Sequence, residues 1–307
     1  MTDAAPVSAY RLFEVEVRRT ARLSPSFTRF TFTGDDLDRF ADNGYDQRIK
    51  FVLPLPGVAL STLPRGDGWF ARWRALPDER RNPIRTYTVR AVRRHAREVD
   101  VDLVLHGEAG PATRWATHAV PGDAVALLGP DTGFLGDNGG AEFRPPAGTS
   151  ALLLAGDETA VPAVASILER LPADAWGDVL LEVPGADDRL PLVAPPGVRI
   201  TWLPRGDGAH GRLLEPLVQK AAARLVGRRH ASVDEPAPPD DGTDLIWDVP
   251  QPGAAATSED CGPGVYAWLA GEAGVITSLR RQLVRDLGVD RRRVAFMGYW
   301  RQGRAES

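Results

Sequence analysis

Cysteine is almost absent from the sequence, and this excludes several ways of holding a redox centre. The only cysteine among the 307 residues is Cys261. One thiol can form neither an intramolecular disulfide nor the cysteine ligand set of an iron–sulfur cluster. The five histidines are scattered without the spacing of a metal site, so no metal ligand is predicted. Any redox cofactor must therefore be bound by other residue types.

Long apolar runs and an excess of positive charge are missing too. No stretch of about 18 residues is apolar and uncharged, so we expect no membrane span and no stable membrane insertion. The formal net charge is -4, which predicts no nucleic-acid partner. The first seven residues lack the basic head and apolar core of a signal peptide, so we expect a cytoplasmic protein. No particular oligomeric state is predicted.

The first half of the chain is typical of a small antiparallel β-barrel. Alternating apolar residues predict strands at 10–18, 27–32, 47–53, 85–92, 99–105 and 124–128. Turn residues such as Gly66-Asp67-Gly68 separate them. Short strands at this spacing favour a barrel. A helix beginning at Pro111 is expected to interrupt it, because proline is favourable in a first helical turn.

Strands alternate with helices in the second half, which predicts a parallel sheet in an α/β domain. The expected strands are 150–155, 178–183, 198–203, 264–270 and 293–297, with helices at 160–171 and from 271 to 287. We therefore predict two domains, 1–145 and 146–307. The stretch 228–263 is rich in Pro, Asp, Gly and Ala, and we expect a mobile insertion there, as a variable surface loop or as a lid over substrate.

The run Arg85-Thr86-Tyr87-Thr88 has the residue types that a flavin site needs. A flavin requires a cation or free N–H groups for its pyrophosphate, an aromatic or apolar wall for its ring, and a hydrogen-bond partner at N5. Arg85 and Tyr87 should share one face of a strand, with Arg85 at the phosphates and Tyr87 along the ring. Thr88 would serve the N5 edge, mainly through its backbone N–H. Such a run also occurs on ordinary exposed strands.

A second part of the predicted site lies where a strand ends and a helix begins. Asp102, Val104 and His106 are expected at the end of the strand. Gly110, Pro111 and Ala112 open the helix, whose free N–H groups form an anion site. Together these elements predict a cradle for a diphosphate.

The second half contains a candidate nicotinamide site. Asp157 and Thr159 follow a strand and precede a helix, at the end of a parallel strand where dinucleotides bind. Glu272 lies in a similar turn. The usual G-x-G-x-x-G pattern is absent, and the Thr159 hydroxyl would equally suit a helix end. Arg205 would pair with a 2′-phosphate, which favours NADPH over NADH. Trp300 would cover the flavin ring or pack at the domain seam.

Taken in order, these motifs resemble the siderophore-interacting protein family, the FAD-containing ferric-siderophore reductases of the ferredoxin reductase-like superfamily. The resemblance spans residues 11–303 outside the insertion. It implies a barrel that binds FAD, followed by a domain that binds NADPH or NADH. It also implies FAD contacts for Arg85, Tyr87, Thr88, His106, Pro111, Ala112 and Trp115. The matching segments are Arg85–Arg90, Leu105–Gly107, Gly110–Ala112, Trp115-Ala116, Ala155–Ala160, Pro162-Ala163, Trp268–Glu272 and Gly298–Gly303.

The resemblance further implies a reductase that moves electrons from NAD(P)H through FAD to Fe(III) in a siderophore, releasing Fe(II) for cellular iron use. No acid–base catalytic residue is predicted. Five basic residues could attract an anionic ferric siderophore, although each also suits an ordinary surface: Arg48, Lys50, Arg72, Arg74 and Arg114. Two alternatives stay open. One is a flavin reductase that serves a protein electron carrier, and the other is a non-enzymatic flavin- or siderophore-binding protein.

Overall fold

A computed structural model describes residues 7–66, 68–105, 110–227, 247–249 and 264–303. The chain divides into two compact units, the first ending at Ala141 and the second beginning at Glu142. The expected insertion at 228–263 lies outside the described residues, apart from 247–249. There the short strand β10 (Trp247–Asp248) pairs antiparallel with the last strand of the second unit.

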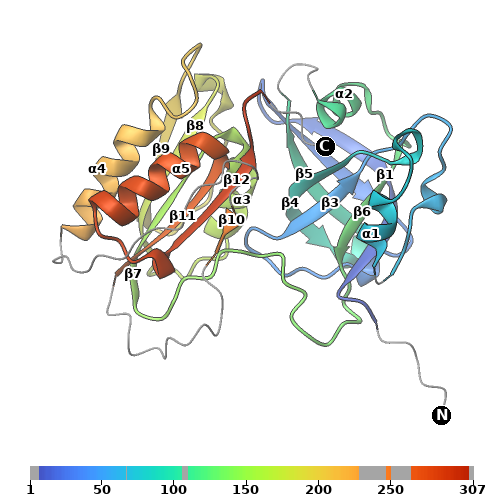
Figure 1. Ribbon diagram of the computed structural model, residues 1–307, viewed down its shortest axis with the longest axis horizontal. Coiled ribbons are helices and arrows are strands. Elements are labelled where there is room, and N and C mark those ends of the chain that lie inside the picture. Colours follow the sequence, from blue (N-terminus) through green and yellow to red (C-terminus); the bar gives the residue numbers. More distant parts are fainter. Residues whose placement is uncertain (1–6, 67, 106–109, 228–246, 250–263, 304–307) are drawn as a thin grey trace. The chain divides into compact units, whose positions relative to one another are not determined.

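The first unit is a closed antiparallel barrel, as predicted (Figure 1). The strands follow one another around it in the order β1-β2-β5-β4-β3-β6. Their bounds are β1 (Tyr10–Arg22), β2 (Phe27–Thr33), β3 (Arg48–Val52), β4 (Ile84–Arg93), β5 (Glu98–Val104) and β6 (Ala124–Pro130). β1 is longer than expected, because the apolar alternation stops at Val17 while pairing with β2 continues past a bulge to Arg22.

The barrel interior is filled by the apolar residues whose alternation predicted the strands. Phe13, Phe30, Phe32 and Phe51 are fully buried within it. The expected helix α2 (Pro111–His118) packs Ala112 and Ala116 against this core. Helix α2 is therefore fixed by the same core as the strands.

A second helix of the barrel unit, α1 (Trp69–Arg74), was not predicted. The glycines before it indicated only a turn. The helix forms because Trp73, 8% exposed, joins Leu12, Val52 and Leu128 in a separate apolar cluster outside the barrel. Short 3-10 helices complete this unit at Leu37–Arg39, Leu60–Thr62, Asp78–Arg80 and Arg94–Ala96.

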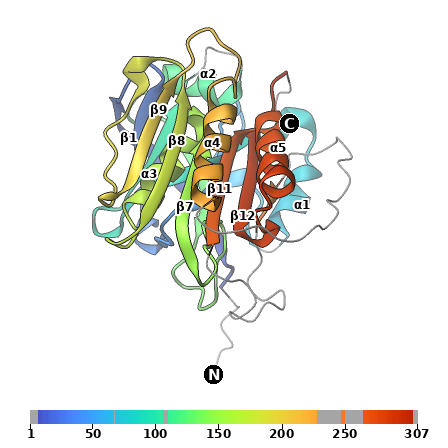
Figure 2. The same cartoon turned by 90° about the vertical axis from the view of Figure 1, so that its left-hand side faces the viewer.

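The second unit is a sheet in the order β10-β12-β11-β7-β8-β9, parallel except for β10. Helices α4 and α5 cover one face of this sheet (Figure 2). The strands are β7 (Thr149–Gly156), β8 (Trp176–Val183), β9 (Gly197–Pro204), β11 (Gly264–Glu272) and β12 (Val294–Trp300), and the helices are α3 (Val161–Leu168), α4 (Leu214–Val226) and α5 (Ala273–Arg281). Short helices lie at Glu158–Ala160, Ala186–Asp188, Gln282–Asp286 and Arg291–Arg293.

The strand order fixes where a ligand of the second unit would enter. From β7 the chain moves outward through β8 and β9, and it then returns to β11 on the other side of β7. The switch point therefore lies between β7 and β11, and parallel sheets bind ligands outside the carboxyl ends of the strands at such a point. α4 was not predicted, although Leu214, Val218 and Leu225 give its buried face a helical spacing.

Candidate functional site

The run expected to bind flavin lies on β4. Arg85 and Tyr87 pair with Phe51 and Ile49 of β3, which belong to the barrel core. Cross-strand partners share a face, so Arg85 and Tyr87 lie on one face of β4, as the alternation predicted. Tyr87 is half-buried, and its ring meets Phe51 edge-on with centroids 5.6 Å apart. Arg85 Nη1 donates to the Ile84 carbonyl at 2.8 Å.

Thr86 and Thr88 lie on the opposite face of β4. Thr88 is buried, whereas Thr86 is exposed and accepts a hydrogen bond from Lys50 Nζ at 2.8 Å. Arg48 is the partner of Thr88 on β3, and Lys50 is the partner of Thr86. The structure therefore brings two of the five expected basic residues directly beside the predicted flavin run.

The other three expected basic residues lie on helices and are exposed. On α1, Arg72 Nη2 donates to the carbonyl of Arg65 at 2.7 Å. The guanidinium of Arg74 lies over the ring of Phe70, 5.9 Å from its centroid. Arg114 lies on α2. The five residues thus occupy three separate elements rather than one continuous strand edge.

The junction expected to hold a diphosphate is described in part. β5 ends at Val104, and α2 begins at Pro111 after Gly110. The N-cap residue of α2 is Gly110, which has no side chain, so among the described residues no N-cap side chain occupies the N–H groups of the first turn. A Cβ on Gly110 would meet nothing within 4 Å, which shows that this backbone is open. His106 lies outside the described residues.

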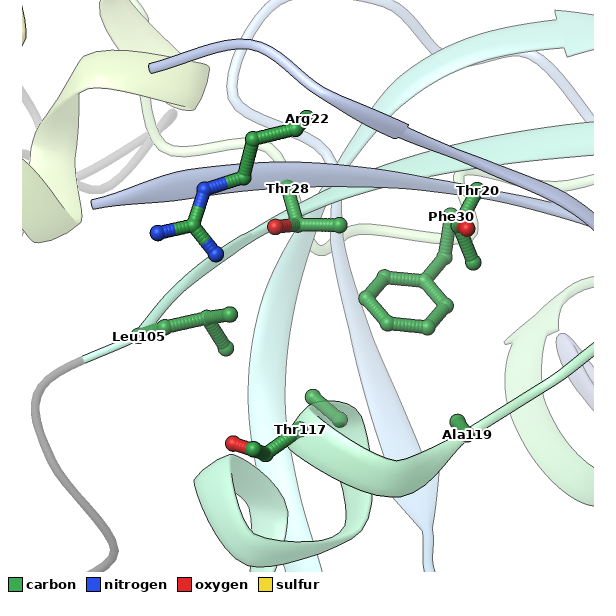
Figure 3. A pocket seen from close by; sticks show the side chains of 8 residues that line it. Thr20, Arg22, Thr28, Phe30, Leu105, Thr117 and Ala119 are labelled. Carbon is green, nitrogen blue, oxygen red and sulfur yellow. The ribbon is translucent and has the colours of Figure 1, made fainter. Parts of the chain in front are cut away.

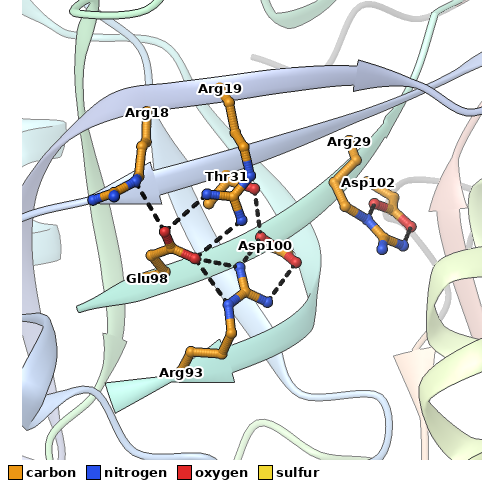
Figure 4. A network of polar contacts seen from close by, with 8 residues as sticks. All are labelled: Arg18, Arg19, Arg29, Thr31, Arg93, Glu98, Asp100 and Asp102. Carbon is orange, nitrogen blue, oxygen red and sulfur yellow. Dashed lines mark hydrogen bonds and ion pairs between the residues drawn. The ribbon is translucent and has the colours of Figure 1, made fainter. Parts of the chain in front are cut away.

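Asp102 and Trp115 both have partners within the barrel unit. Asp102 is 3% exposed and accepts hydrogen bonds from Arg29 at 2.7 and 2.8 Å (Figure 4). The half-buried ring of Trp115 lies 5.3 Å from Phe30 and 5.2 Å from Phe51. Both residues therefore have structural roles, and their contacts with a cofactor stay predictions.

A cavity of about 480 Å³ opens between the β1–β2 pair and α2 (Figure 3). Nε of Arg22, at its rim, donates to the carbonyl of Ser24 at 2.7 Å. Within the described chain, none of the residues expected to bind a cofactor lines this cavity. The lining residues are Thr20, Arg22, Thr28, Phe30, Leu105, Ala116, Thr117 and Ala119.

The carboxyl edge of the second unit's sheet brings together the other expected residues. Asp157 follows β7 directly and is 3% exposed. Its carboxylate accepts hydrogen bonds from the backbone N–H of Thr159 at 2.9 Å and of Glu272 at 2.8 Å. It also accepts one from the indole N–H of Trp300 at 2.8 Å. Burial, with the charge of Glu158 added, raises the pKa of Asp157 to about 6.

Thr159 and Glu272 act as helix-end groups in this arrangement. The hydroxyl of Thr159 donates to Asp157. Glu272 caps α5 by accepting from the backbone N–H of Val275 at 2.9 Å, and its other oxygen accepts from Gln302 N at 3.2 Å. Their contacts with nicotinamide stay predictions.

Arg205 lies in a buried ion pair with Glu158. Its side chain is 7% exposed, that of Glu158 is fully buried, and both Nη atoms reach carboxylate oxygens at 2.5 Å. The expected pairing of Arg205 with a 2′-phosphate is therefore not supported, because the guanidinium is already committed. Elsewhere in this unit, the guanidinium of Arg280 lies over the ring of Phe296, 4.5 Å from its centroid.

Two polar residues at this edge were not predicted. Glu182 is fully buried and caps α4, accepting from Gly211 N at 2.7 Å and Leu214 N at 3.2 Å. The ring of His210 meets Trp300 edge-on, with centroids 4.7 Å apart. A lone carboxylate inside an apolar strand could have indicated Glu182. Nothing in the sequence indicated His210.

The described residues contain no group of three or more His, Cys, Asp and Glu side chains placed to hold a metal ion. Within the same part of the chain, no helix has both the length and the apolar character needed to cross a bilayer.

Comparison with known proteins gives two matches that together span most of the chain. Residues 16–134 match the model of the siderophore-interacting FAD-binding domain. Residues 149–303 match the model of the siderophore-interacting protein. The first match covers the barrel and the second covers the parallel sheet.

Individual relatives align over both units. An uncharacterised protein of Mycobacterium tuberculosis is 36% identical over 299 residues, covering 96% of this chain and 92% of the relative. Ferric vibriobactin reductase ViuB of Vibrio cholerae is 30% identical over 288 residues, covering 94% and 89%. The solved structure of the siderophore-interacting protein SipS from Aeromonas hydrophila has a TM-score of 0.67 at 30% identity, covering 97% of this chain and 94% of that one.

Proposed function

The chain belongs to the siderophore-interacting protein family, and we propose that it is a flavoenzyme that uses NAD(P)H to reduce ferric iron held by a siderophore. The observation that carries the proposal is the similarity to ferric vibriobactin reductase over both units, with 30% identity across 94% of this chain. The FAD-binding match over residues 16–134 supports FAD as the cofactor. We place the reaction in the cytoplasm, where Fe(II) released from the siderophore would be used.

We assign FAD to the first domain, 1–145, and the residues present fit it on two counts. The uncapped first turn of α2 after the open backbone of Gly110 suits a diphosphate. Arg85 adds a cation on the same face of β4 as the half-buried ring of Tyr87. Thr88 would serve the flavin edge through its backbone, because its side chain is only 6% exposed. His106, Pro111 and Trp115 join this set through the family resemblance.

We assign the nicotinamide to the second domain, 146–307, at the switch point between β7 and β11. When bound, FAD would take two electrons from the nicotinamide as a hydride and return them singly to two ferric ions. Asp157, Thr159, Glu272 and Trp300 are linked at this edge by hydrogen bonds. Because Arg205 is paired with Glu158, NADH and NADPH are both candidate donors, and the ratio of their kcat/KM values decides between them.

We propose that Arg48 and Lys50 attract the ferric siderophore. Both lie on β3 as direct partners of Thr88 and Thr86, which places positive charge beside the flavin run. Charge at a rim of this kind raises the rate of encounter with an anion, and salt screens the effect. Arg72, Arg74 and Arg114 lie on α1 and α2 and would contribute less.

The test follows the flavin spectrum through a complete turnover. The protein is loaded with FAD and treated with NADH or NADPH without oxygen, and a ferric siderophore is then added with a chelator that reports Fe(II). We expect the visible flavin band to bleach and then return, with two Fe(II) formed for each nicotinamide oxidised. A protein that takes up FAD but is not bleached would be a binding protein. A protein that bleaches but reduces only ferredoxin or flavodoxin would be a carrier reductase.

The two lysines of the chain provide a matched pair for the siderophore rim. Lys50→Glu is expected to lower kcat/KM for an anionic ferric siderophore about tenfold at low salt. Lys220→Glu, an exposed change of the same charge on α4, should have no such effect. Reduction of a neutral dye should stay normal in both variants. Equal siderophore kinetics in the two variants would remove Lys50 from the rim.

A further inference from the structure

The Asp157 carboxylate accepts four hydrogen bonds, two at each oxygen. Oδ1 accepts from the backbone N–H of Thr159 at 2.9 Å and from its hydroxyl. Oδ2 accepts from the backbone N–H of Glu272 and from the indole N–H of Trp300, both at 2.8 Å. An ionised carboxylate offers about four lone-pair positions, so this one is saturated. Asp157 therefore has no acceptor left for a cofactor group.

Trp300 is held from a second side as well. Its ring meets the ring of His210 edge-on, at 4.7 Å between centroids and 76° between planes. The indole N–H bond fixes the direction in which the ring points, and the His210 contact fixes its tilt. Gly271 packs its backbone against the same carboxylate, where a Cβ would lie 2.6 Å from Asp157 Oδ2. One carboxylate thus joins the ends of β7, β11 and β12.

We propose that Asp157 is a positioning residue, which holds the Trp300 ring in one orientation where β7, β11 and β12 end, beside the proposed nicotinamide site. The inference rests on the proposed function, because it takes NAD(P)H as the ligand that binds at this edge. Without its hydrogen bond to Asp157, the Trp300 indole would sample several rotamers. NAD(P)H would then have to order the indole on binding. That cost raises KM and leaves kcat nearly unchanged.

Protonation of Asp157 weakens the anchor. A neutral carboxyl group carries a proton on one oxygen, so one of the four donors loses its acceptor. Because burial and the charge of Glu158 raise the pKa of Asp157 to about 6, this happens in mildly acidic solution. Burial first, and then Arg205, lowers the pKa of His210, which faces Trp300. The other charged groups around the site are Glu158, Glu182, Arg205 and Glu272.

The kinetic test is a double-mutant cycle on the full FAD-loaded chain, with a one-electron dye as acceptor. Asp157→Ala and Trp300→Phe, which keeps a ring but loses the indole N–H, should each raise KM for the nicotinamide about fivefold. The double variant should show no further rise, because Asp157 acts through Trp300. Asp187→Ala changes an exposed carboxylate of the same unit and should leave KM as it is. Increases in KM that multiply in the double variant would overturn the proposal.

A spectroscopic test does not depend on turnover. In isotope-labelled protein, the indole N–H signal of Trp300 is identified by its loss in Trp300→Phe. We expect it to shift in Asp157→Ala, and to titrate near pH 6 in both the wild type and His210→Gln. A signal that Asp157→Ala does not move, or a titration that His210→Gln abolishes, would show that Asp157 is not the anchor. A wild type that oxidises no nicotinamide but passes this test would refute the proposed function alone.

Discussion

The barrel and the α/β unit hold their buried carboxylates by different partners. In the barrel, Glu98 and Asp100 lie on the outer face of β5 beneath arginine side chains (Figure 4). Glu98 accepts from Arg19 at 2.8 and 3.0 Å and from Arg93 at 2.9 Å. Hydrogen bonding from Arg19 above all lowers the pKa of Glu98 to about 2. Burial opposes ionisation of Asp100, yet bonds from Arg93 and Thr31 still lower its pKa.

At the carboxyl edge of the α/β unit, backbone groups replace most of the arginines. Asp157 accepts its hydrogen bonds from uncharged backbone, hydroxyl and indole donors. Burial, and then the charge of Glu158, raises its pKa to about 6. Glu182 accepts from backbone N–H groups at the start of α4. Arg205, an arginine at this edge, is committed to Glu158.

This difference predicts where single substitutions do most damage. The barrel arginines reach water, with Arg19 51% and Arg93 31% exposed, and each carboxylate has more than one donor. Exposed ion pairs contribute about 0–1 kcal/mol. At the sheet edge the Arg205 side chain is only 7% exposed and that of Glu158 is fully buried, so loss of the guanidinium leaves a buried charge without this partner. The edge is thus the more fragile region, and it is also the region where the nicotinamide is expected to bind.

The largest expected effect comes from Arg205→Met, which leaves Glu158 charged and fully buried. We expect a loss of about 3–5 kcal/mol in the free energy of unfolding, measured with urea. The double variant Arg205→Met/Glu158→Leu should recover most of it, because it removes both charges. A single variant that loses less than about 1 kcal/mol would erase the contrast with the barrel.

Gly271→Ala tests the packing behind Asp157. Gly271 has a φ of +147°, and an added Cβ would lie 2.6 Å from Asp157 Oδ2. Backbone strain and this contact together should cost about 1–3 kcal/mol in unfolding free energy. The control is Gly288→Ala, at a φ of +64° with nothing within 4 Å of the new Cβ, where strain alone costs about 1 kcal/mol. A loss at Gly271 no larger than that at Gly288 would mean that neither the Asp157 contact nor the more extreme φ adds to ordinary left-handed strain.

In the barrel, Arg93→Gln should cost only about 1 kcal/mol, although Arg93 bonds both Glu98 and Asp100. The two carboxylates keep Arg19 and Thr31 as donors. Arg18→Gln, at a 55% exposed side chain, is the matched control and should cost less than about 0.5 kcal/mol. Both losses should shrink at high salt, and a salt-independent loss at Arg93 would indicate packing rather than charge.

The same contrast explains what the sequence predicted and what it did not. Strands were predictable, because alternation such as that of Phe30 and Phe32 is a local pattern that burial on one face imposes. Helix α1 was not, because Trp73 is ordered by Leu12 and Leu128, which lie far away in the chain. Local signals fix the elements, and distant packing decides between a turn and a helix.

For the candidate sites, the sequence indicated which strand ends matter, but not which side chains pair with one another there. The ends of β7 and β11 are neighbours in the sheet, and the end of β12 brings Trp300 to Asp157, a contact that the sequence did not predict. The pairing of Arg205 with Glu158 joins residues 47 apart, and that of Arg29 with Asp102 joins residues 73 apart. No spacing rule links such residues, so a guanidinium expected at a phosphate is found in a buried ion pair.

The smallest effect concerns acid, and the two regions should respond to it with opposite signs. The pKa of Glu98 is lowered from 4.5 to about 2, so on acidification the unfolded chain binds this proton first. The stability that charged Glu98 contributes is therefore present above pH 4.5 and is lost as the pH falls towards 2. The pKa of Asp157 is raised from 3.8 to about 6, so on acidification the folded chain binds this proton first. The stability that protonated Asp157 contributes is therefore lost as the pH rises through 6. The free energies of unfolding of the wild type and Glu98→Gln, measured with urea, should therefore differ by less than about 1 kcal/mol near neutral pH, because the arginines are exposed. This difference should vanish in acid. A difference that grows in acid would mean that Arg19 and Arg93 do not stabilise the charged form of Glu98. The barrel would then not differ from the α/β unit in how acid changes its stability.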